Sequence, residues 1–258
     1  MDERTERVLP DLEVRLAEGG SGRPVLILHG GGGPATVVPI AEHLQPAHRV
    51  LMPTHPGWNG TPRPAWLDSI DELAMVYLRL LRQSGLSDIL VIGSSIGGWL
   101  AAQMAVRDLD GLVGRLVLIN AVGVEIAGQP MADFFGLSPR GIAEHAYHEP
   151  DRFFVDPATL PPERLAQQRS NISTLRALAG EPYMHDPELF GRLKQIRIPA
   201  LVAWGESDRI ATPQYGAEYA RALGNARFEL IARAGHLPQL ERPEELFSLL
   251  DAFAAEPA

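Results

Sequence analysis

The chain contains no cysteine. This absence excludes disulfide bonds, a thiolate nucleophile and a zinc site built on cysteine ligands. Long apolar runs are also missing, since no stretch approaches the roughly 18 consecutive apolar residues that a membrane span requires. The N-terminal segment MDERTERVLP is charged where a signal peptide would be apolar. We therefore expect a soluble, cytoplasmic protein.

Basic clusters are scarce as well. The formal net charge is −9, with 23 lysines and arginines against 32 acidic residues. This balance argues against nucleic acid or an anionic membrane surface as a partner. The 258 residues, 45% of them hydrophobic, are enough for one large domain with a full core. The sequence leaves the oligomeric state open.

Short apolar runs alternate with longer amphipathic segments along most of the chain. PVLILHG, DILVIGS and ALVAWG have the composition of buried strands. Residues 69–84 carry apolar side chains at helical spacing, and Gly85 is expected to end that helix. The alternation predicts an α/β fold with a mainly parallel, doubly wound sheet flanked by helices.

Residues 125–196 break this rhythm. They are rich in proline, aromatic side chains and short helical patterns, with no convincing strand. Strand-like runs of the same sheet resume after this segment, which indicates an insertion rather than an independent domain. We predict a core formed by residues 1–124 and 197–258, with a helical insertion at 125–196.

Two adjacent serines, Ser94 and Ser95, lie in the segment ILVIGSSIGGWLAA. A serine becomes an effective nucleophile when a base removes its proton and a sharp strand-to-helix turn holds it clear of the sheet. Such a turn needs glycine two residues before and two residues after the serine, because the backbones crowd there. Ser95 has Gly93 and Gly97 at those places, whereas Ser94 has isoleucines. We predict that Ser95 is the nucleophile, the alternative being a serine in a structural turn.

A nucleophilic serine also needs a histidine base and an acid that orients the histidine. After Ser95, the run ALVAW ends in GESDRI, which offers Asp208 and, in reserve, Glu206. The next strand-like run ends in ARAGH, which places His236 in a loop. Because the carboxyl ends of parallel strands meet at one edge, Asp208 and His236 can reach Ser95. The alternatives are a solvated carboxylate and a hydrogen-bonded loop histidine.

Other polar residues end strand-like runs at the same edge. Asn120 does so, but its amide cannot carry the charge of an acid. His29 and His55 also end strands there, but they precede Ser95 in the chain. We expect structural roles for both histidines.

The tetrahedral intermediate of acyl transfer needs two backbone N–H donors for its oxyanion. One donor is expected from Ile96, directly after the nucleophile. The glycine loop HGGGGPA supplies the other, and we choose Gly31, with Gly32 close behind. No lysine follows these glycines, so the loop is not a phosphate-binding loop. A flexible glycine turn is the alternative.

Taken in order, LILHGGGG, HPGWNGTPRP, VIGSSIGGW, LVAWGESDRI and AGHLPQLERPEE resemble the signatures of the α/β-hydrolase superfamily. The resemblance covers residues 25–123 and 199–253, and the insertion falls where such enzymes carry a cap. It implies a triad of Ser95, Asp208 and His236, with no cofactor and no metal.

The first functional hypothesis is a serine hydrolase for a small or medium apolar ester, lactone or thioester. The alternative is a carbon–carbon bond hydrolase for a vinylogous diketo acid, because the glycine loop is similar to that of ring-fission hydrolases. Many of those enzymes carry asparagine where this chain has Ser94, and they need a basic group for the substrate carboxylate. Arg169 or Arg176 could serve, although solvent-facing side chains are the favoured interpretation of both. A non-catalytic ligand-binding protein is a remote third possibility. Ser94 and Trp99 are further candidates for substrate contact, although core packing against the sheet is the favoured interpretation of Trp99.

Overall fold

The computed structural model describes residues 1–256. Its centre is an eight-stranded sheet with the order β1-β2-β4-β3-β5-β6-β7-β8. The neighbouring strands in the run β4-β3-β5-β6-β7-β8 are all parallel. Strand β2 pairs antiparallel with both β1 and β4. The strands are β1 (Asp2–Leu9), β2 (Leu12–Gly19), β3 (Pro24–Leu28), β4 (Arg49–Thr54), β5 (Ile89–Ser94), β6 (Val113–Ile119), β7 (Ala200–Gly205) and β8 (Ala226–Ile231). The predicted α/β class and mainly parallel sheet are confirmed.

Strand β1 is the element that the sequence analysis missed. Its residues DERTERVL are mostly charged or polar, and among them only Val8 is buried. The strand lies at the edge of the sheet, where one hydrogen-bonded neighbour and a largely solvated face suffice. An edge strand of this kind carries almost no apolar signal, so its sequence resembles a solvated terminus.

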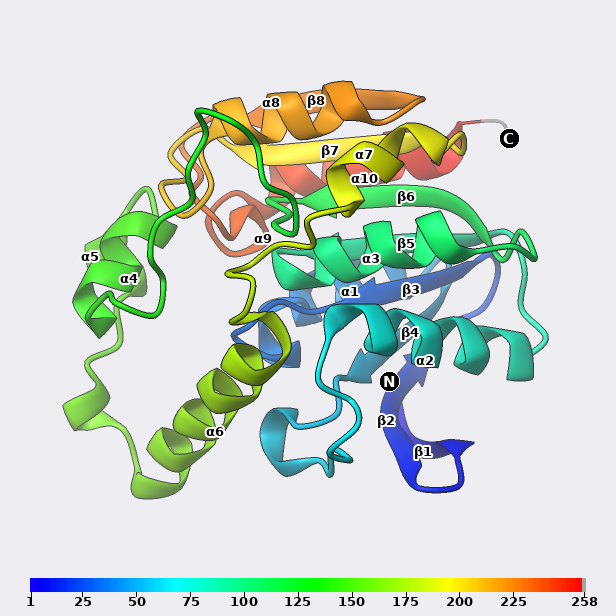
Figure 1. Cartoon of the computed structure of the whole chain (residues 1–258), viewed down its shortest axis with the longest axis horizontal. Coiled ribbons are helices and arrows are strands. Elements are labelled where there is room, and N and C mark those ends of the chain that lie inside the picture. Colours follow the sequence, from blue (N-terminus) through cyan, green and yellow to red (C-terminus); the bar gives the residue numbers. More distant parts are fainter. Residues whose placement is uncertain (257–258) are drawn as a thin grey trace.

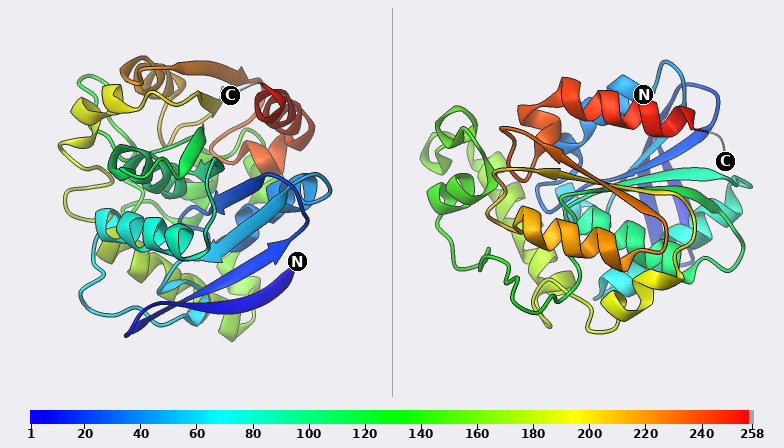
Figure 2. Two further views of the ribbon diagram at one scale, coloured as in Figure 1. Left: turned by 90° about the vertical axis from the view of Figure 1, so that its right-hand side faces the viewer. Right: turned by 90° about the horizontal axis from the view of Figure 1, so that it is seen from above.

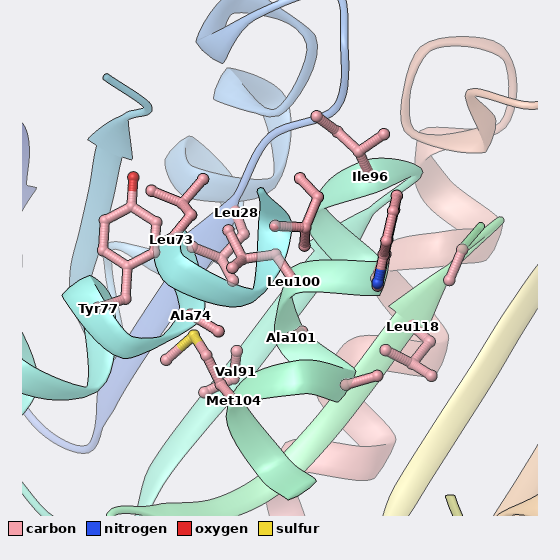
Figure 3. Close-up of a cluster of buried hydrophobic side chains, with 14 of the residues drawn as sticks. Leu28, Leu73, Ala74, Tyr77, Val91, Ile96, Leu100, Ala101, Met104 and Leu118 are labelled. Atoms are coloured by element: carbon pink, nitrogen blue, oxygen red, sulfur yellow. The ribbon is translucent and has the colours of Figure 1, made fainter. Parts of the chain in front are cut away.

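Helices cover both faces of the sheet, as the edge-on view on the right of Figure 2 shows. On one face, α1 (Val38–Leu44) and α10 (Pro243–Ala255) bury Ile40, Leu44, Leu246 and Leu250. On the other face lie α2 (Ile70–Gln83), α3 (Ile96–Arg107) and α8 (Pro213–Ala222). Figure 3 shows part of this second core, in which side chains of α2 and α3 pack on strands β3, β5 and β6. The sheet is therefore doubly wound.

The predicted helix at 69–84 corresponds closely to α2. Ser69 caps its N-terminus by accepting a hydrogen bond from the Glu72 amide at 3.2 Å. The helix ends just before Gly85, whose φ of +65° lies in the left-handed region that glycine adopts without strain. Local capping chemistry thus fixes both ends of the helix.

Residues 125–196 contain helices and, within the described chain, no strand. The longest helix, α6, runs over Pro162–Ala179 and lies with α4 and α5 at the left of Figure 1, beyond the ends of the strands. The other helical elements here are α4 (Pro139–Ala146), α5 (Pro150–Phe153), α7 (Leu189–Arg192) and the short 3-10 turns at Pro157–Thr159 and Leu193–Gln195. We call residues 125–196 the cap, and its exact boundaries stay a prediction.

Three short elements complete the chain. They are the 3-10 turns at Pro34–Thr36 and Trp58–Gly60 and the helix α9 (Pro238–Glu241). All three follow strands at the edge that faces the cap. Within residues 1–256, no helix is long and apolar enough to cross a membrane.

Candidate active site

Ser95 lies at the sharp turn between β5 and α3. Its φ of 56° and ψ of −120° place a non-glycine residue in a strained conformation that the neighbouring chain must enforce. A Cβ atom on Gly93 would lie 2.1 Å from the carbonyl oxygen of Gly97. One on Gly97 would lie 2.2 Å from that of Leu28. The glycines on either side of Ser95 are thus required by backbone crowding, which is the physical basis of the predicted pattern.

The three residues predicted as a triad meet at the carboxyl ends of their strands. Ser95 Oγ lies 2.9 Å from Nε2 of His236, and Nδ1 of the same ring lies 2.8 Å from Oδ2 of Asp208. Asp208 follows β7 and His236 follows β8, so the parallel sheet brings together groups far apart in the sequence. The geometry suits proton transfer from the serine to the histidine, with the acid fixing the tautomer.

Asp208 is buried, with 2% of its surface exposed, and its carboxylate is surrounded by donors. Oδ1 accepts hydrogen bonds from the amides of Ile210 and Ala211 at 2.8 and 3.2 Å. Oδ2 accepts from the Asn120 side-chain amide at 2.7 Å in addition to His236. These four contacts satisfy both oxygens of the buried Asp208 side chain.

Asn120 is a neighbour of Asp208 to which the sequence analysis gave no role. It follows β6, is fully buried, and has a left-handed φ of 45°. Its side-chain oxygen accepts from the Gly205 amide at 3.2 Å while its amide donates to Asp208. The reserve acid Glu206 is exposed and accepts from the Arg233 amide, away from the histidine. A polar residue at a strand end on the correct edge was the available signal for Asn120.

The predicted oxyanion donors lie beside the nucleophile. Gly31, Gly32 and Ile96 line the same cavity as Ser95. Ile96 is the first residue of α3, so its N–H has no acceptor within that helix. The Gly31 carbonyl accepts a hydrogen bond from Trp58 Nε1 at 2.9 Å, which fixes the orientation of the glycine loop. The arrangement is suited to a developing oxyanion.

Two buried histidines brace this glycine loop. His55 donates its backbone N–H to Nε2 of His29 at 3.0 Å, so His29 must donate from Nδ1 to the Gly30 carbonyl at 2.7 Å. Nε2 of His55 lies 3.0 Å from the His29 carbonyl, and its Nδ1 lies 2.6 Å from the Tyr77 hydroxyl. One neutral tautomer of each ring satisfies every contact. The structural role expected for both histidines is therefore supported by their hydrogen bonds.

Burial sets the charge state of these groups. It lowers the pKa of His29 from 6.5 to about 4, and the hydrogen bond to the Gly30 carbonyl offsets this only in part. Burial also lowers the pKa of His55 well below 6.5, with a further contribution from His29. Both rings are neutral at pH 7, as their hydrogen bonds require.

A cavity of about 590 Å³ opens between the core and the cap and reaches Ser95 and His236. The glycine loop and the nucleophile turn form its floor. The cap supplies most of its walls, and the side chains there are mainly apolar, including Met131, Phe134, Phe153, Phe154, Ile172 and Leu175. Such a cavity fits a substrate with a sizeable apolar portion next to a reactive carbonyl.

A model of the alpha/beta hydrolase family matches residues 25–249. The chain belongs to this family. A 2-hydroxy-6-oxononadienedioate/2-hydroxy-6-oxononatrienedioate hydrolase of Paraburkholderia phymatum is 26% identical over 272 residues, covering 95% of this chain and 92% of that protein. Lipase 1 of Psychrobacter immobilis is 28% identical, covering 96% of this chain and 86% of that protein. A meta-cleavage product hydrolase structure has a TM-score of 0.80 at 20% identity over 98% of both chains, a likeness of fold alone. The protein is therefore a hydrolase.

Two residues suggested for substrate contact do not line the cavity of this alpha/beta hydrolase. Ser94 is 1% exposed, and its Oγ lies 3.3 Å from Nε2 of Gln239. Trp99 belongs to the core on the α3 face, and a Cβ atom on Gly123 would lie 2.2 Å from its ring. Both side chains are buried in the protein. Ser94 ends β5 and contacts Gln239, whereas Trp99 lies in the first turn of α3 and packs in the core.

The two cap arginines of this alpha/beta hydrolase occupy different environments. Arg169 lines the cavity from α6 and is exposed. Among the described residues that line the cavity, it is the only arginine, lysine or acidic side chain. Arg176 instead stacks on the Phe135 ring, 4.2 Å from the guanidinium carbon to the ring centroid. Only Arg169 is placed to meet a substrate anion.

Proposed function

We propose that this chain is a serine hydrolase in which Ser95 attacks a substrate carbonyl. His236 takes the serine proton, Asp208 orients the histidine, and the amides of Gly31 and Ile96 stabilise the oxyanion. The observation that carries this proposal is the continuous hydrogen-bonded chain from Ser95 through His236 to Asp208 at the floor of the cavity.

For the substrate, we propose an acidic vinylogous diketone whose carbon–carbon bond is cleaved. Curated relatives from Paraburkholderia phymatum and Comamonas testosteroni are named for hydrolysis of such compounds. The cavity offers the matching elements, a mainly apolar interior and one cation, Arg169. A guanidinium binds a carboxylate through paired charge-assisted hydrogen bonds.

The proposed reaction adds water across the cleaved bond. The substrate reacts as its diketo tautomer, in which the carbon next to the ketone is saturated. Ser95 Oγ attacks the ketone carbonyl, and the carbon–carbon bond breaks with its electron pair delocalised through the double bond onto the 2-oxo group of the acid fragment. His236 returns the proton to that fragment, which leaves an acyl group on Ser95. Water then attacks the acyl carbonyl while His236 takes its proton, and His236 passes that proton to Ser95 Oγ as the carboxylic acid leaves. Arg169 holds the carboxylate of the conjugated fragment throughout.

Hydrolysis of apolar esters is the second candidate, and two observations favour it. Lipase 1 of Psychrobacter immobilis is similar over 96% of this chain. Ser94, where many ring-fission hydrolases carry asparagine, is turned away from the cavity and contacts Gln239. The ester reaction needs no group beyond the triad and oxyanion donors.

A paired substrate assay separates the candidates. We expect turnover of 2-hydroxy-6-oxo-6-phenylhexa-2,4-dienoate by wild type, and Arg169→Gln should raise its KM about 10- to 100-fold through loss of a charged hydrogen bond. The matched control is Arg164→Gln, an exposed α6 arginine that does not line the cavity. Turnover of p-nitrophenyl esters alone, insensitive to Arg169→Gln, would establish the ester reaction instead. Tight binding with no turnover of either would contradict both.

The expected partner is thus a small apolar acyl or ketone compound. The net charge of −9 supports this over nucleic acid or an anionic membrane surface. A cytoplasmic location stays a prediction.

A further inference from the structure

Part of the cap lies directly against the loops that carry the triad. The amide of Arg209, next to Asp208, donates to the His145 carbonyl at 2.9 Å. The amide of His236 itself donates to the Ala146 carbonyl at 2.6 Å. Residues 145–149 comprise the last two residues of α4 and the link from α4 to α5 (Figure 1). They contact both the acid loop and the histidine loop. We call them the cap segment.

A buried carboxyl group joins the same two parts of the chain. Glu241 ends the short helix α9 and is only 6% exposed. Its Oε1 accepts from the amides of His148 and Glu149 at 2.9 and 3.0 Å, and its Oε2 accepts from the Gly235 amide at 2.6 Å. One side chain thus binds two amides of the cap segment and the amide next to His236.

The backbones at this contact are too close for a side chain. A Cβ atom on Gly235 would lie 2.2 Å from the Ala146 carbonyl oxygen and 2.8 Å from the Tyr147 Cα atom. Glu241 does not line the cavity and belongs to none of the catalytic groups. Three amides depend on its two oxygens. The Gly235 amide among them is buried, and an unpaired buried amide costs about 1–3 kcal/mol. The contact therefore needs a side chain with two acceptor oxygens at position 241.

We propose that Glu241 is a positioning residue that couples the cap to His236, so that the histidine is held against Ser95 only while the cap segment is docked. This inference rests on the proposed serine hydrolase function, since it concerns the geometry of that triad. Glu241 acts through Gly235 and Ala146, and the cap thereby controls both access to the cavity and the readiness of the base.

Glu241→Gln is the first test variant, because glutamine has nearly the same shape but only one acceptor oxygen. It can accept from the cap segment or from Gly235, and its NH₂ group faces the other amide. Glu244→Gln, an exposed change in the first turn of α10, is the control. We measure the rate at which a small fluorophosphonate labels Ser95, which reports triad geometry without depending on a substrate.

The labelling rate should fall about 10- to 100-fold in Glu241→Gln, as expected for a misplaced base, and stay at the wild-type value in Glu244→Gln. Coupling also predicts a reciprocal effect on amide hydrogen exchange. In wild type, the phosphonyl adduct should slow exchange at 235–236 and at 145–149. In Glu241→Gln, it should slow exchange at 235–236 only. A merely structural role would lower stability without removing this linkage.

Gly235→Ala disturbs the contact between the histidine loop and the cap segment while Glu241 is unchanged. Its added methyl group should displace the cap segment and remove the linkage in the same way. If Glu241→Gln is folded, labels at the wild-type rate and retains the linkage, the inference is overturned while the proposed function stands. If wild-type Ser95 is not labelled, the proposed function fails. Amide hydrogen exchange then tests the coupling by itself. Glu241→Gln should speed exchange at both 235–236 and 145–149, and unchanged exchange would overturn the coupling.

Discussion

Acidification should destabilise the protein through the two histidines that brace the glycine loop. His29 has a pKa of about 4 in the folded chain because it is fully buried, against 6.5 when exposed. The unfolded chain therefore binds a proton that the folded chain does not bind between these values. The stability that neutral His29 provides is complete above pH 6.5 and is lost progressively as the pH falls toward 4.

The size of the effect follows from the difference in pKa. The shift in the pKa of His29 corresponds to about 3 kcal/mol of unfolding free energy once the pH is below both pKa values. About 2 kcal/mol of this stability should already be lost at pH 5. His55 is shifted in the same direction and adds to the loss. Most carboxylates remain ionised down to pH 5, so the window between 6.5 and 5 isolates the histidines.

Urea unfolding at pH 7.5, 6.5, 5.75 and 5 measures the effect directly. The slope of unfolding free energy against pH should correspond to uptake of between one and two protons per unfolding event at the acidic end. In the native protein, the NMR signals of His29 and His55 should not titrate above pH 5. Unfolding free energy that is flat across this window, or titration of either ring near pH 6.5, would show that burial does not keep the two histidines neutral.

Three substitutions test the rest of the site. Ser94→Ala should keep most of the turnover, because the side chain does not line the cavity, and a loss above about 10-fold in kcat would contradict this. Gly97→Ala places a methyl group 2.2 Å from the Leu28 carbonyl oxygen. Thermal unfolding should show a loss of about 2 kcal/mol or more in unfolding free energy, together with slower fluorophosphonate labelling of Ser95. A wild-type melting temperature would contradict the crowding at this turn. Asn120→Asp sets a second carboxyl group about 2.7 Å from Asp208. Because two carboxyl groups this close share a proton, kcat at pH 7 should fall on the order of 100-fold. An undiminished kcat would show that the amide of Asn120 is not needed.

The core strands and the meeting of Ser95, Asp208 and His236 could be predicted because their signals are local. Strand β5, the glycines around Ser95 and the acid and histidine at later strand ends each require particular residue types at fixed places. The parallel sheet then brings Ser95, Asp208 and His236 to one edge, whatever the length of chain between them. The prediction needs only the edge of the sheet at which each residue lies, and not the distances between the side chains.

The remaining parts depend on packing that no local pattern encodes. Glu241 looks like an exposed residue in LERPEE, and only the approach of the cap segment buries it. Trp99 sits one turn beyond the nucleophile, but whether it faces the cavity or the core depends on the pitch of α3 against the sheet. Arg169 and Arg176 are equivalent by spacing, and the position of Phe135 separates them. Strand β1 was missed because a solvated edge strand has no apolar alternation.

Intact mass after treatment with a small fluorophosphonate tests the central claim, that Ser95 is an activated nucleophile. Wild type, Ser94→Ala and Ser95→Ala are treated alike at neutral pH. Activation of Ser95 predicts one adduct on wild type and on Ser94→Ala, and none on Ser95→Ala. An adduct that persists in Ser95→Ala, or no adduct on folded wild type, would contradict it.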